Sequence, residues 1–454
     1  MDAPIVGTAV LQTCEVAITG LSHDGQGVGR LDDGQVVFVP DLLPGERARV
    51  RIVQRARRHL IGHCQERLSD NPQRRRPPCI LADHCGGCSL QHLDHQGQLA
   101  SKHDMVAQAL GRIGSVSLQP DPVLGSASDL GYRNRTVIPL ERCADGRLRA
   151  GFYRRGSHQI VNMNHCPVLD PRLDALIEPL KRDLELSDWP VDRHRRADGG
   201  LRHLALRIGH HSGEILITLI ASHDRFEGLD ALARTWLERW PAVVGVVLNL
   251  QPQPSNTLFG AQTLLLAGRD WLSERFCGLR FQLGCDTFFQ VNTPQAERVL
   301  PLLLEALPAG ESALVDAYCG VGAFSLPLAA AGHRVTGLEL QGAAVDLARS
   351  NAQINNLAAK ASFQQGPVAE HLATLLPQSD AVLVDPPRKG LEAAVRDALI
   401  QHPVSRLLYL SCDPATLARD LGMLLAGPYR LERVQPFDFF PNTSHVECLA
   451  VLSS

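Results

Sequence analysis

The chain has 454 residues, of which 44% are hydrophobic and 20% are charged, and its formal net charge at pH 7 is −3. This composition is that of ordinary globular proteins, and it excludes a disordered, collagen-like or fibrous chain. The length exceeds what one hydrophobic core usually serves, so we expect about three domains. No apolar run reaches the roughly 18 residues of a membrane helix, and the first residues lack the pattern of a signal peptide. The sequence therefore predicts a soluble cytoplasmic protein.

Residues 14–66 alternate short apolar runs with glycine-bearing turns, a pattern typical of short strands. This spacing predicts a small antiparallel barrel of the OB-like type that binds oligonucleotides, and we assign it residues 10–68. Between Arg47 and Arg76, ten arginines accompany two acidic residues. This positive segment is either a phosphate-contacting surface or a solvated face, and a charge run alone favours the second interpretation.

The stretch 69–285 mixes strand-like pieces with loops, and we expect it to form a mixed central domain. It carries Cys79, Cys85 and Cys88 with the spacing C-x5-C-x2-C, and a distant Cys166 that precedes a proline. A disulfide framework is not expected, because the cytosol keeps thiols reduced. Four thiolates could instead hold a tetrahedral zinc ion or an iron-sulfur cluster. The sequence therefore predicts a metal site.

From residue 286 to residue 454, apolar strands alternate with amphipathic helices. This alternation predicts a Rossmann-like α/β domain, in which helices wrap a mostly parallel sheet. In such sheets the ligand lies at the carboxyl ends of the strands. The residues at these ends are therefore the candidates for a functional site.

The strand ALVDAY runs into a loop that contains Gly320 and Gly322 and then into a helix, which allows close approach of the backbone to a ligand. The loop lacks the full GxGxxG spacing of dinucleotide folds. Glu339, 23 residues after Asp316, ends the next strand and could hold ribose hydroxyls. This combination suits S-adenosylmethionine better than a dinucleotide, although a tight turn without a ligand has the same pattern.

Two further strand ends carry candidate reactive groups. Asp385 is followed by two prolines, which form a rigid edge that faces the acceptor base in methyltransferase-like sheets. The DPP sequence also occurs in adenine amino-methyltransferases, so it does not choose the acceptor. Cys412 ends a strand just before a helix, where the helix dipole and unpaired N–H groups favour a thiolate. Cys412 is thus a candidate nucleophile, and the alternative is an inert buried cysteine.

A thiolate beside a methyl donor has a specific chemical use. Carbon 5 of uracil is a poor nucleophile, but addition of a thiolate to carbon 6 creates an enolate that can attack a sulfonium methyl group. A base must then remove the proton at carbon 5 so that the thiolate can leave. Glu447 is the candidate base, with His445 two positions away on the same face of a terminal strand. Spacing alone does not distinguish this role from that of a surface charge.

Together, the segments SCDPATLARDL, HVE, DTFFQVN, DAYCGVGAFSLPLA and DPPRKG resemble the RNA uracil-5 methyltransferases, most closely those that act on 23S ribosomal RNA. The resemblance covers nearly the whole chain. It implies that Cys412 is the nucleophile and Glu447 the base. It also places further side chains at the cofactor and the target uracil, namely Gln290, Tyr318, Glu339 and Asp385. Relatives often carry asparagine where this chain has Asp413 and Ala323, and Ala323 removes one cofactor hydrogen bond.

The resemblance extends to the first half of the chain. CEVAITGLSHDGQGVGR is similar to the TRAM domain, an RNA-binding module, and this favours RNA binding by the arginine-rich segment. With the cysteine-proline ligand, the resemblance also favours a 4Fe-4S cluster over zinc, with a structural or RNA-contacting role. The segments 131–140 and 151–161 interleave aromatic residues with arginine, as expected for stacking and phosphate contacts on folded RNA, and the alternative is a half-buried sheet.

The sequence thus predicts methylation of carbon 5 of a uridine in structured RNA, with 23S ribosomal RNA preferred and no obligate protein partner. A transfer RNA uridine is the first alternative. An adenine amino-methyltransferase and a non-catalytic RNA-binding or redox-sensing cluster protein are the others.

Overall fold

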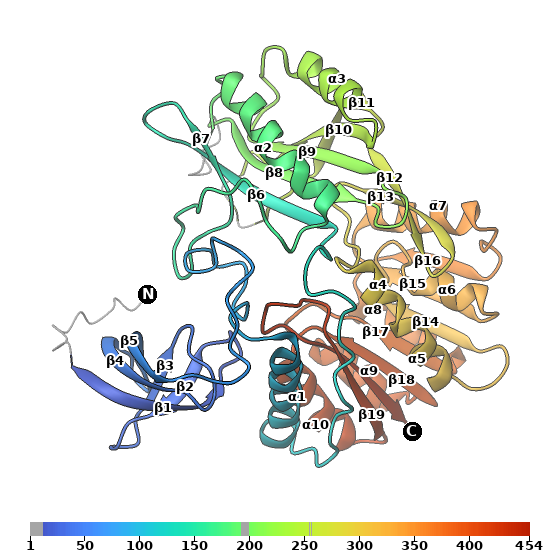
Figure 1. The fold of residues 1–454 in the computed structure, drawn as a ribbon. Helices are drawn as coiled ribbons and strands as arrows, with labels where there is room; N and C mark the ends of the chain where they lie inside the picture. Colours follow the sequence, from blue (N-terminus) through green and yellow to red (C-terminus); the bar gives the residue numbers. More distant parts are fainter. Residues whose placement is uncertain (1–11, 192–198, 254, 256) are drawn as a thin grey trace.

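The computed structural model describes residues 12–191, 199–253, 255 and 257–454. Within these residues the chain forms a closed barrel, a six-stranded sheet, a two-stranded ribbon and a seven-stranded sheet (Figure 1). The first two residues of the predicted barrel range lie outside the described residues. No helix of the described part of the chain is both long and apolar enough to cross a membrane.

The barrel has the strand order β1-β2-β3-β5-β4. Its strands are β1 (Thr13–Leu21), β2 (Gly27–Arg30), β3 (Val36–Val39), β4 (Arg47–Arg55) and β5 (Leu60–Ser69). Alternate residues of a strand share one face, and Val37, Val39 and Val50 accordingly fill the barrel interior. The predicted barrel is confirmed, with one difference: β3 and β5 pair in parallel rather than antiparallel.

The six-stranded sheet has the order β11-β10-β9-β8-β6-β7. Its strands are β6 (Arg135–Arg142), β7 (Leu148–Ala150), β8 (Leu201–Ile208), β9 (Ile215–Ala221), β10 (Val243–Leu250) and β11 (Gln262–Gly268). Strands β8 and β9 are buried at every position, as expected for the centre of a covered sheet. Helices α2 (Pro171–Leu186) and α3 (Leu229–Arg239) pack against this sheet (Figure 1).

The seven-stranded sheet has the order β16-β15-β14-β17-β18-β20-β19. Its strands are β14 (Ala313–Ala317), β15 (Arg334–Glu339), β16 (Ala361–Gln365), β17 (Ala381–Val384), β18 (Arg406–Ser411), β19 (Arg430–Phe437) and β20 (Glu447–Ser453). The five strands from β16 to β18 pair in parallel, and β20 pairs antiparallel with both β18 and β19. The predicted mostly parallel sheet is confirmed.

Helices cover both faces of this sheet, which makes three layers. The helices that follow the ribbon are α4 (Thr293–Glu297), α5 (Val299–Ala306), α6 (Ser325–Ala330), α7 (Gly342–Ile354), α8 (Val368–Leu375), the 3-10 helix η1 (Leu376–Gln378), α9 (Ala393–Gln401) and α10 (Pro414–Leu425). Side chains of α5, α6 and α7 belong to one core, and those of α8, α9 and α10 belong to another.

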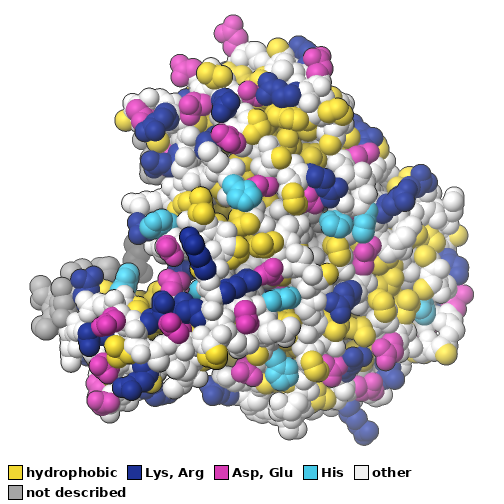
Figure 2. Space-filling model, viewed as in Figure 1, with side chains coloured by type: hydrophobic (Ala, Val, Ile, Leu, Met, Phe, Trp, Pro, Cys, Tyr) yellow, Lys and Arg dark blue, Asp and Glu magenta, His cyan; other side chains and the backbone are white. Residues whose placement is uncertain are grey.

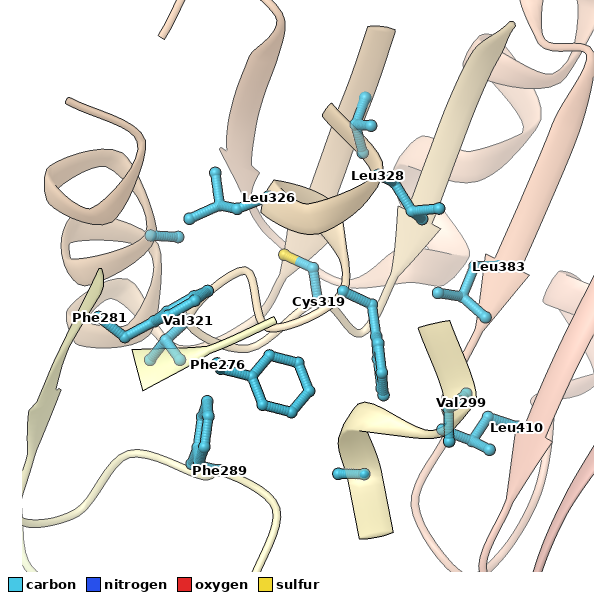
Figure 3. Close-up of a cluster of buried hydrophobic side chains, with 14 of the residues drawn as sticks. Phe276, Phe281, Phe289, Val299, Cys319, Val321, Leu326, Leu328, Leu383 and Leu410 are labelled. Carbon is cyan, nitrogen blue, oxygen red and sulfur yellow. The ribbon is translucent and has the colours of Figure 1, made fainter. Parts of the chain in front are cut away.

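Two elements from earlier in the chain also support this sheet. Helix α1 (His95–Arg112) contacts α10, and its residues Val106 and Leu110 lie in the core with α8, α9 and α10. The ribbon of β12 (Trp271–Phe276) and β13 (Leu279–Gly284) contributes Phe276 and Phe281 to the other core. Figure 3 shows these rings beside the loop that follows β14.

Candidate active site

The loop after β14 has an unusual backbone at three positions. Tyr318, Gly320 and Gly322 have φ values of +70°, +56° and +84°. Glycine adopts this left-handed region freely, whereas a bulky residue there costs about 1–2 kcal/mol and is typical of ligand sites. Glu339, at the end of β15, accepts hydrogen bonds from the N–H groups of Gly320 at 3.1 Å and Gln341 at 2.8 Å. The carboxylate of Glu339 therefore fixes the shape of this loop.

A pocket lies beside the loop. Its lining residues are Phe288, Phe289, Gln290, Asp316, Tyr318, Cys319, Gly320, Val321, Ala323, Phe324 and Asp385. The structure thus brings together four of the predicted cofactor residues. Glu339 lies behind the loop and contacts it through Gly320. Gly322 is outside this lining, and a Cβ atom there would lie 3.1 Å from the ring of Phe363. This glycine therefore permits close packing of the loop.

Gln290 is held at the pocket by two neighbours. The adjacent Phe289 is buried, and its ring lies 5.4 Å from that of Phe276 in a perpendicular arrangement (Figure 3). Asn134, just before β6, donates a hydrogen bond from Nδ2 to the backbone oxygen of Gln290 at 2.9 Å. Gln290 itself is only 6% exposed. The loop that carries Gln290 is therefore anchored on both sides.

Cys412 and Glu447 are brought together by the pairing of β18 with β20. In this antiparallel pair Ser411 is opposite Cys448. One residue further, Cys412 follows β18 and Glu447 begins β20. Residues directly opposite in such a ladder have Cα atoms roughly 5 Å apart. The predicted nucleophile and the predicted base are therefore neighbours.

Burial controls how these groups titrate. Desolvation, followed by the charges of Glu447 and Asp385, raises the pKa of Cys412 to about 12, and the charge of Arg388 opposes this shift. Burial also raises the pKa of Glu447 well above its usual value, with Asp385 adding to the effect. Desolvation followed by the charge of Asp316 raises the pKa of Asp385 to about 7. At neutral pH the free site thus holds a neutral thiol.

The terminus of α10 does not favour a thiolate at Cys412 in the way expected from the sequence. Asp413 is the N-cap of α10 and accepts the N–H groups of Ala415 and Thr416, both at 2.9 Å. Aspartate is among the preferred N-cap residues because its carboxylate satisfies these donors. The N–H groups expected to favour a thiolate are therefore bonded to Asp413. The cation that lowers the pKa of the thiol is Arg388.

Asp316 is a further acidic residue at the pocket that the sequence analysis did not place there. It is buried in β14, and its Oδ2 accepts a hydrogen bond from Ser325 Oγ at 2.5 Å. Desolvation raises the pKa of Asp316 to about 7. The available signal was one aspartate in an otherwise apolar strand, ALVDA, that ends at the glycine loop.

His445 differs from the expectation that it shares a strand face with Glu447. Strand β20 begins at Glu447, so His445 precedes it, and its side chain lies at the surface. Its Nε2 is 3.4 Å from Arg388 Nη2. Although the residue is exposed, neighbouring atoms desolvate part of its ring, and this desolvation together with the charge of Arg388 lowers the pKa of His445 to about 4, so the ring is neutral at physiological pH.

The two segments expected to stack on RNA have different environments. In the first, Tyr132 is buried and donates to the backbone oxygen of Pro441 at 3.1 Å. Arg135 donates to the backbone oxygens of Cys285 and Thr287 at 2.9 and 3.1 Å. The expected RNA contacts are therefore wrong for these two side chains, because both are used inside the protein.

The second segment lies at the surface, as an RNA-contacting role requires. Residues 152–158 and the glycines of the cysteine loop line an open hollow of about 520 Å³. The rings of Tyr153 and His158 lie 5.7 Å apart in a perpendicular arrangement. The charged head groups of Arg154 and Arg155 are at this same surface.

Three of the four predicted metal ligands, Cys85, Cys88 and Cys166, have raised pKa values. Burial raises the pKa of Cys88 to about 11 and that of Cys166 to about 12, and neighbouring cysteines of the set add to both effects. Backbone N–H groups of Leu81 and Gly87 donate to the sulfur atoms of Cys79 and Cys85, each at 3.4 Å. Among the described residues, no three cysteine, histidine or acidic side chains are grouped closely enough to hold a metal ion. The predicted metal site, whether for zinc or for a cluster, is therefore not shown among the described residues.

Comparisons with known proteins identify two parts of the chain. Residues 8–64 match the family model described as TRAM domain. Residues 268–363 and 375–454 match the model described as tRNA (Uracil-5-)-methyltransferase. The second match contains all the predicted catalytic and cofactor residues.

Relatives match over nearly the whole chain. An uncharacterized RNA methyltransferase of Parasynechococcus marenigrum is 52% identical, with 96% of this chain and 95% of the relative covered. One from Bacillus cereus is 36% identical, with 97% and 96% covered.

Among solved structures, the Pyrococcus abyssi tRNA (uracil-54, C5)-methyltransferase in complex with S-adenosyl-L-homocysteine is similar, with a TM-score of 0.77 and 26% identity. The match covers 97% of this chain and all of that chain. The protein is thus a member of the TRAM-containing RNA (uracil-5-)-methyltransferase family.

Proposed function

We propose that the protein transfers a methyl group from S-adenosylmethionine to carbon 5 of a uridine in structured RNA. Cys412 forms a temporary bond to carbon 6, and Glu447 removes the proton from carbon 5. The observation that carries this proposal is the adjacency of Cys412 and Glu447 at the end of β18 and β20, with the charge of Asp385 acting on both.

Each reactive group has a defined task in this scheme. The Cys412 thiol gives its proton to solvent water, and its sulfur adds to carbon 6, which moves the electrons of the ring double bond toward carbon 5. When bound, S-adenosylmethionine supplies an electrophilic methyl group. After carbon 5 has taken up this group, Glu447 accepts the carbon 5 proton, the ring double bond re-forms and the sulfur leaves carbon 6. Arg388 is the nearby cation that favours the thiolate.

Burial and the charge of Asp385 raise the pKa of Glu447, so its carboxylate is a stronger proton acceptor than that of an exposed glutamate. We place the methyl donor in the pocket beside the glycine loop. We assign its contacts to Gln290, Tyr318, Gly320 and Asp385, which line that pocket, and to Glu339, whose carboxylate fixes the loop. Gly322 contributes by letting the loop pack closely.

The acceptor RNA has two candidates. The sequence motifs favour 23S ribosomal RNA. The matching family model and the Pyrococcus abyssi structure are both named for transfer RNA, which supports a transfer RNA uridine as the second candidate. An adenine amino-methyltransferase loses support, because the family is one of uracil-5 enzymes and adenine chemistry has no use for Cys412.

The RNA surface that we propose includes the junction between the barrel and the cysteine loop. A cavity of about 380 Å³ there is lined by Arg67, Arg74, Arg75, Arg76 and Arg155 among others. Four of these five arginines pair with acidic residues, namely Asp70, Glu46, Asp129 and Asp41. Figure 2 shows basic and acidic side chains side by side in this region. The effective positive charge is therefore smaller than the arginine count suggests.

We further propose that Cys79, Cys85, Cys88 and Cys166 hold a 4Fe-4S cluster. Hydrogen bonds from backbone N–H groups to two of these sulfurs support it, because such bonds stabilise the thiolates of cluster sites. A cluster would stabilise the cysteine loop and has no part in the methyl transfer.

The domain ranges 10–68, 69–285 and 286–454 and the cytoplasmic location stay predictions.

The test of this function is to map the modified nucleoside. RNA from cells that lack the protein should have lost 5-methyluridine at one position of 23S ribosomal RNA or of a transfer RNA, and the purified protein should restore it with S-adenosylmethionine. Loss of a methylated adenine instead, with all 5-methyluridine retained, would overturn the proposal.

A further inference from the structure

The loop that connects β19 to β20 is held by four other parts of the chain. The backbone oxygens of residues 439 to 442 each accept a hydrogen bond from a different segment. The donors are Asn292 Nδ2 at 3.2 Å, Lys102 Nζ at 3.0 Å, Tyr132 Oη at 3.1 Å and the backbone N–H of Leu90 at 2.9 Å. Lys102, Tyr132 and Leu90 come from segments outside the seven-stranded sheet.

Asn442 is the most heavily bonded residue of this loop. Its backbone N–H donates to Gln98 Oε1 at 2.7 Å, and its Oδ1 accepts from Arg75 at 2.7 Å and from Gln98 at 3.2 Å. Its Nδ2 donates to the backbone oxygen of Asp129 at 2.6 Å. The residue is fully buried with a φ of +66°, a conformation that asparagine tolerates better than most residues. Every polar atom of Asn442 is therefore bonded.

The start of the loop is fixed by a buried ion pair. Lys102 Nζ lies 2.5 Å from Asp438 Oδ1, and both side chains are fully buried. His95 Nε2 is 3.0 Å from the second oxygen, Asp438 Oδ2. Both His95 and Lys102 belong to α1, so this helix fixes the point where the chain leaves β19.

The end of the loop is fixed by the barrel and the cysteine loop. Ser444 Oγ donates to the backbone oxygen of His23 at 2.7 Å, and Ser89 Oγ is 3.2 Å from the backbone nitrogen of Ser444. Glu447 then opens β20 opposite Phe437, the last residue of β19. The two ends of the loop are therefore the paired residues Phe437 and Glu447. Cys412, in contrast, is carried by β18 and does not depend on this loop for its place.

We propose that Tyr132, Lys102 and Asn442 are positioning residues for proton removal by Glu447. This inference rests on the proposed function and deepens it. Loss of these contacts lets the loop move and displaces Glu447, while the bond between Cys412 and carbon 6 still forms. The variants should therefore accumulate the methylated covalent RNA adduct, because only its breakdown needs the base.

The test uses Tyr132→Phe, which removes one hydroxyl and keeps the ring. Tyr429→Phe is the matched control, because the hydroxyl of Tyr429 is also buried and bonds to Leu399 and Val404 beside the opposite end of β19. In the full-length protein, loss of one such hydrogen bond should lower kcat about 5–10-fold with an unchanged KM for RNA. The fraction of protein in a covalent RNA band on a denaturing gel should rise for Tyr132→Phe and stay at the wild-type level for Tyr429→Phe.

Asn442→Gly is the second variant, because glycine keeps the left-handed backbone and removes only the side-chain bonds. It should accumulate the adduct more strongly than Tyr132→Phe. If both variants lose activity without an increase in adduct, the loop does not position the base. If Glu447→Gln also gives no adduct, Glu447 is not the base of the proposed function. Failure of the loop to position the base is therefore distinguishable from failure of the base assignment.

Discussion

Cys412 and Glu447 face one another across the antiparallel pair of β18 and β20, one residue beyond the pair Ser411 and Cys448. The two groups lie far apart in sequence, and a single strand pairing brings them together. The chemistry of the site therefore depends on the register of this pair, since a shift of one residue would turn Glu447 to the other face of the sheet.

Replacement of Cys412 by alanine removes the atom that bonds to carbon 6. Methyl transfer from labelled S-adenosylmethionine to RNA should fall by at least about 10³-fold, because no covalent route remains. Binding of S-adenosylmethionine should be unchanged, since Cys412 is outside the lining of the cofactor pocket. Cys143→Ala, a change at a half-buried cysteine elsewhere, is the control and should stay active. An active Cys412→Ala protein would end the proposed mechanism.

Replacement of Glu447 by glutamine keeps the shape of the side chain and removes the base. Turnover should fall about 10²–10⁴-fold, the range expected for loss of a general base. The methylated RNA should remain attached to Cys412 and appear as a slow band on a denaturing gel. Rapid release of methylated RNA from this variant would show that another group removes the proton.

Replacement of Glu339 by alanine leaves the N–H groups of Gly320 and Gln341 without their acceptor. The glycine loop should lose its shape, and the affinity for S-adenosylmethionine should fall about 10–100-fold, as expected for lost hydrogen bonds to a charged group. Isothermal titration calorimetry measures this directly. Glu311→Ala is the control, because Glu311 is exposed and pairs with Arg334 at the other end of β15. Equal affinities for both variants would refute the role of Glu339.

The buried carboxyl group of Asp385 should make stability depend on pH. Burial raises the pKa of Asp385 to about 7, so the native state keeps a proton that the unfolded state releases near pH 4. The unfolded state binds fewer protons in this window, and the contribution of Asp385 to the free energy of unfolding therefore falls as the pH rises from about 4 to 7.

Asp385→Asn removes this titration. Between pH 5 and pH 8, the free energy of unfolding should fall by about 1–3 kcal/mol less in the variant than in the wild type. Denaturant unfolding at each pH measures this difference. Asp346→Asn, at an exposed position, should follow the wild-type curve. Identical pH curves for all three proteins would show that Asp385 is not protonated in the folded state.

The cysteine set should bind iron. Protein purified without oxygen should absorb visible light and contain about four iron atoms per chain, as a 4Fe-4S cluster requires. Cys88→Ala should lose both signals, and Cys143→Ser should keep them. One zinc ion per chain with no visible absorption would contradict the cluster and favour the zinc alternative.

The sequence predicted the parts of the site that depend on local pattern. Asp385 and Cys412 each follow a short apolar strand, and Gly320 lies in the loop between a strand and a helix. Strand ends of a parallel sheet meet at one edge, so these positions could be placed together without a structure. The barrel was predictable for the same reason, because alternation and glycine turns are local signals.

The contacts between distant segments could not be predicted in this way. Tyr132 and Arg135 alternate with polar residues in the manner of an RNA-binding strand, and only the fold shows that they bond to backbone oxygens inside the protein. The sequence likewise does not show that the side chain of Asp413 accepts the free N–H groups at the start of α10, because this depends on the geometry of the helix terminus. The rarity of lysine was the one available signal for these contacts, because the chain has only four lysines. The structure shows that two of them, Lys102 and Lys181, are buried and hydrogen-bonded.

The position of β20 affects how the enzyme matures on the ribosome. This strand is made after β19 but lies between β18 and β19, so the sheet cannot be completed while residues 447 to 453 are still in the exit tunnel. The barrel, in contrast, uses only residues made early and can fold first during synthesis. Completion of the catalytic sheet thus waits for the last strand of the chain, whereas closure of the barrel does not.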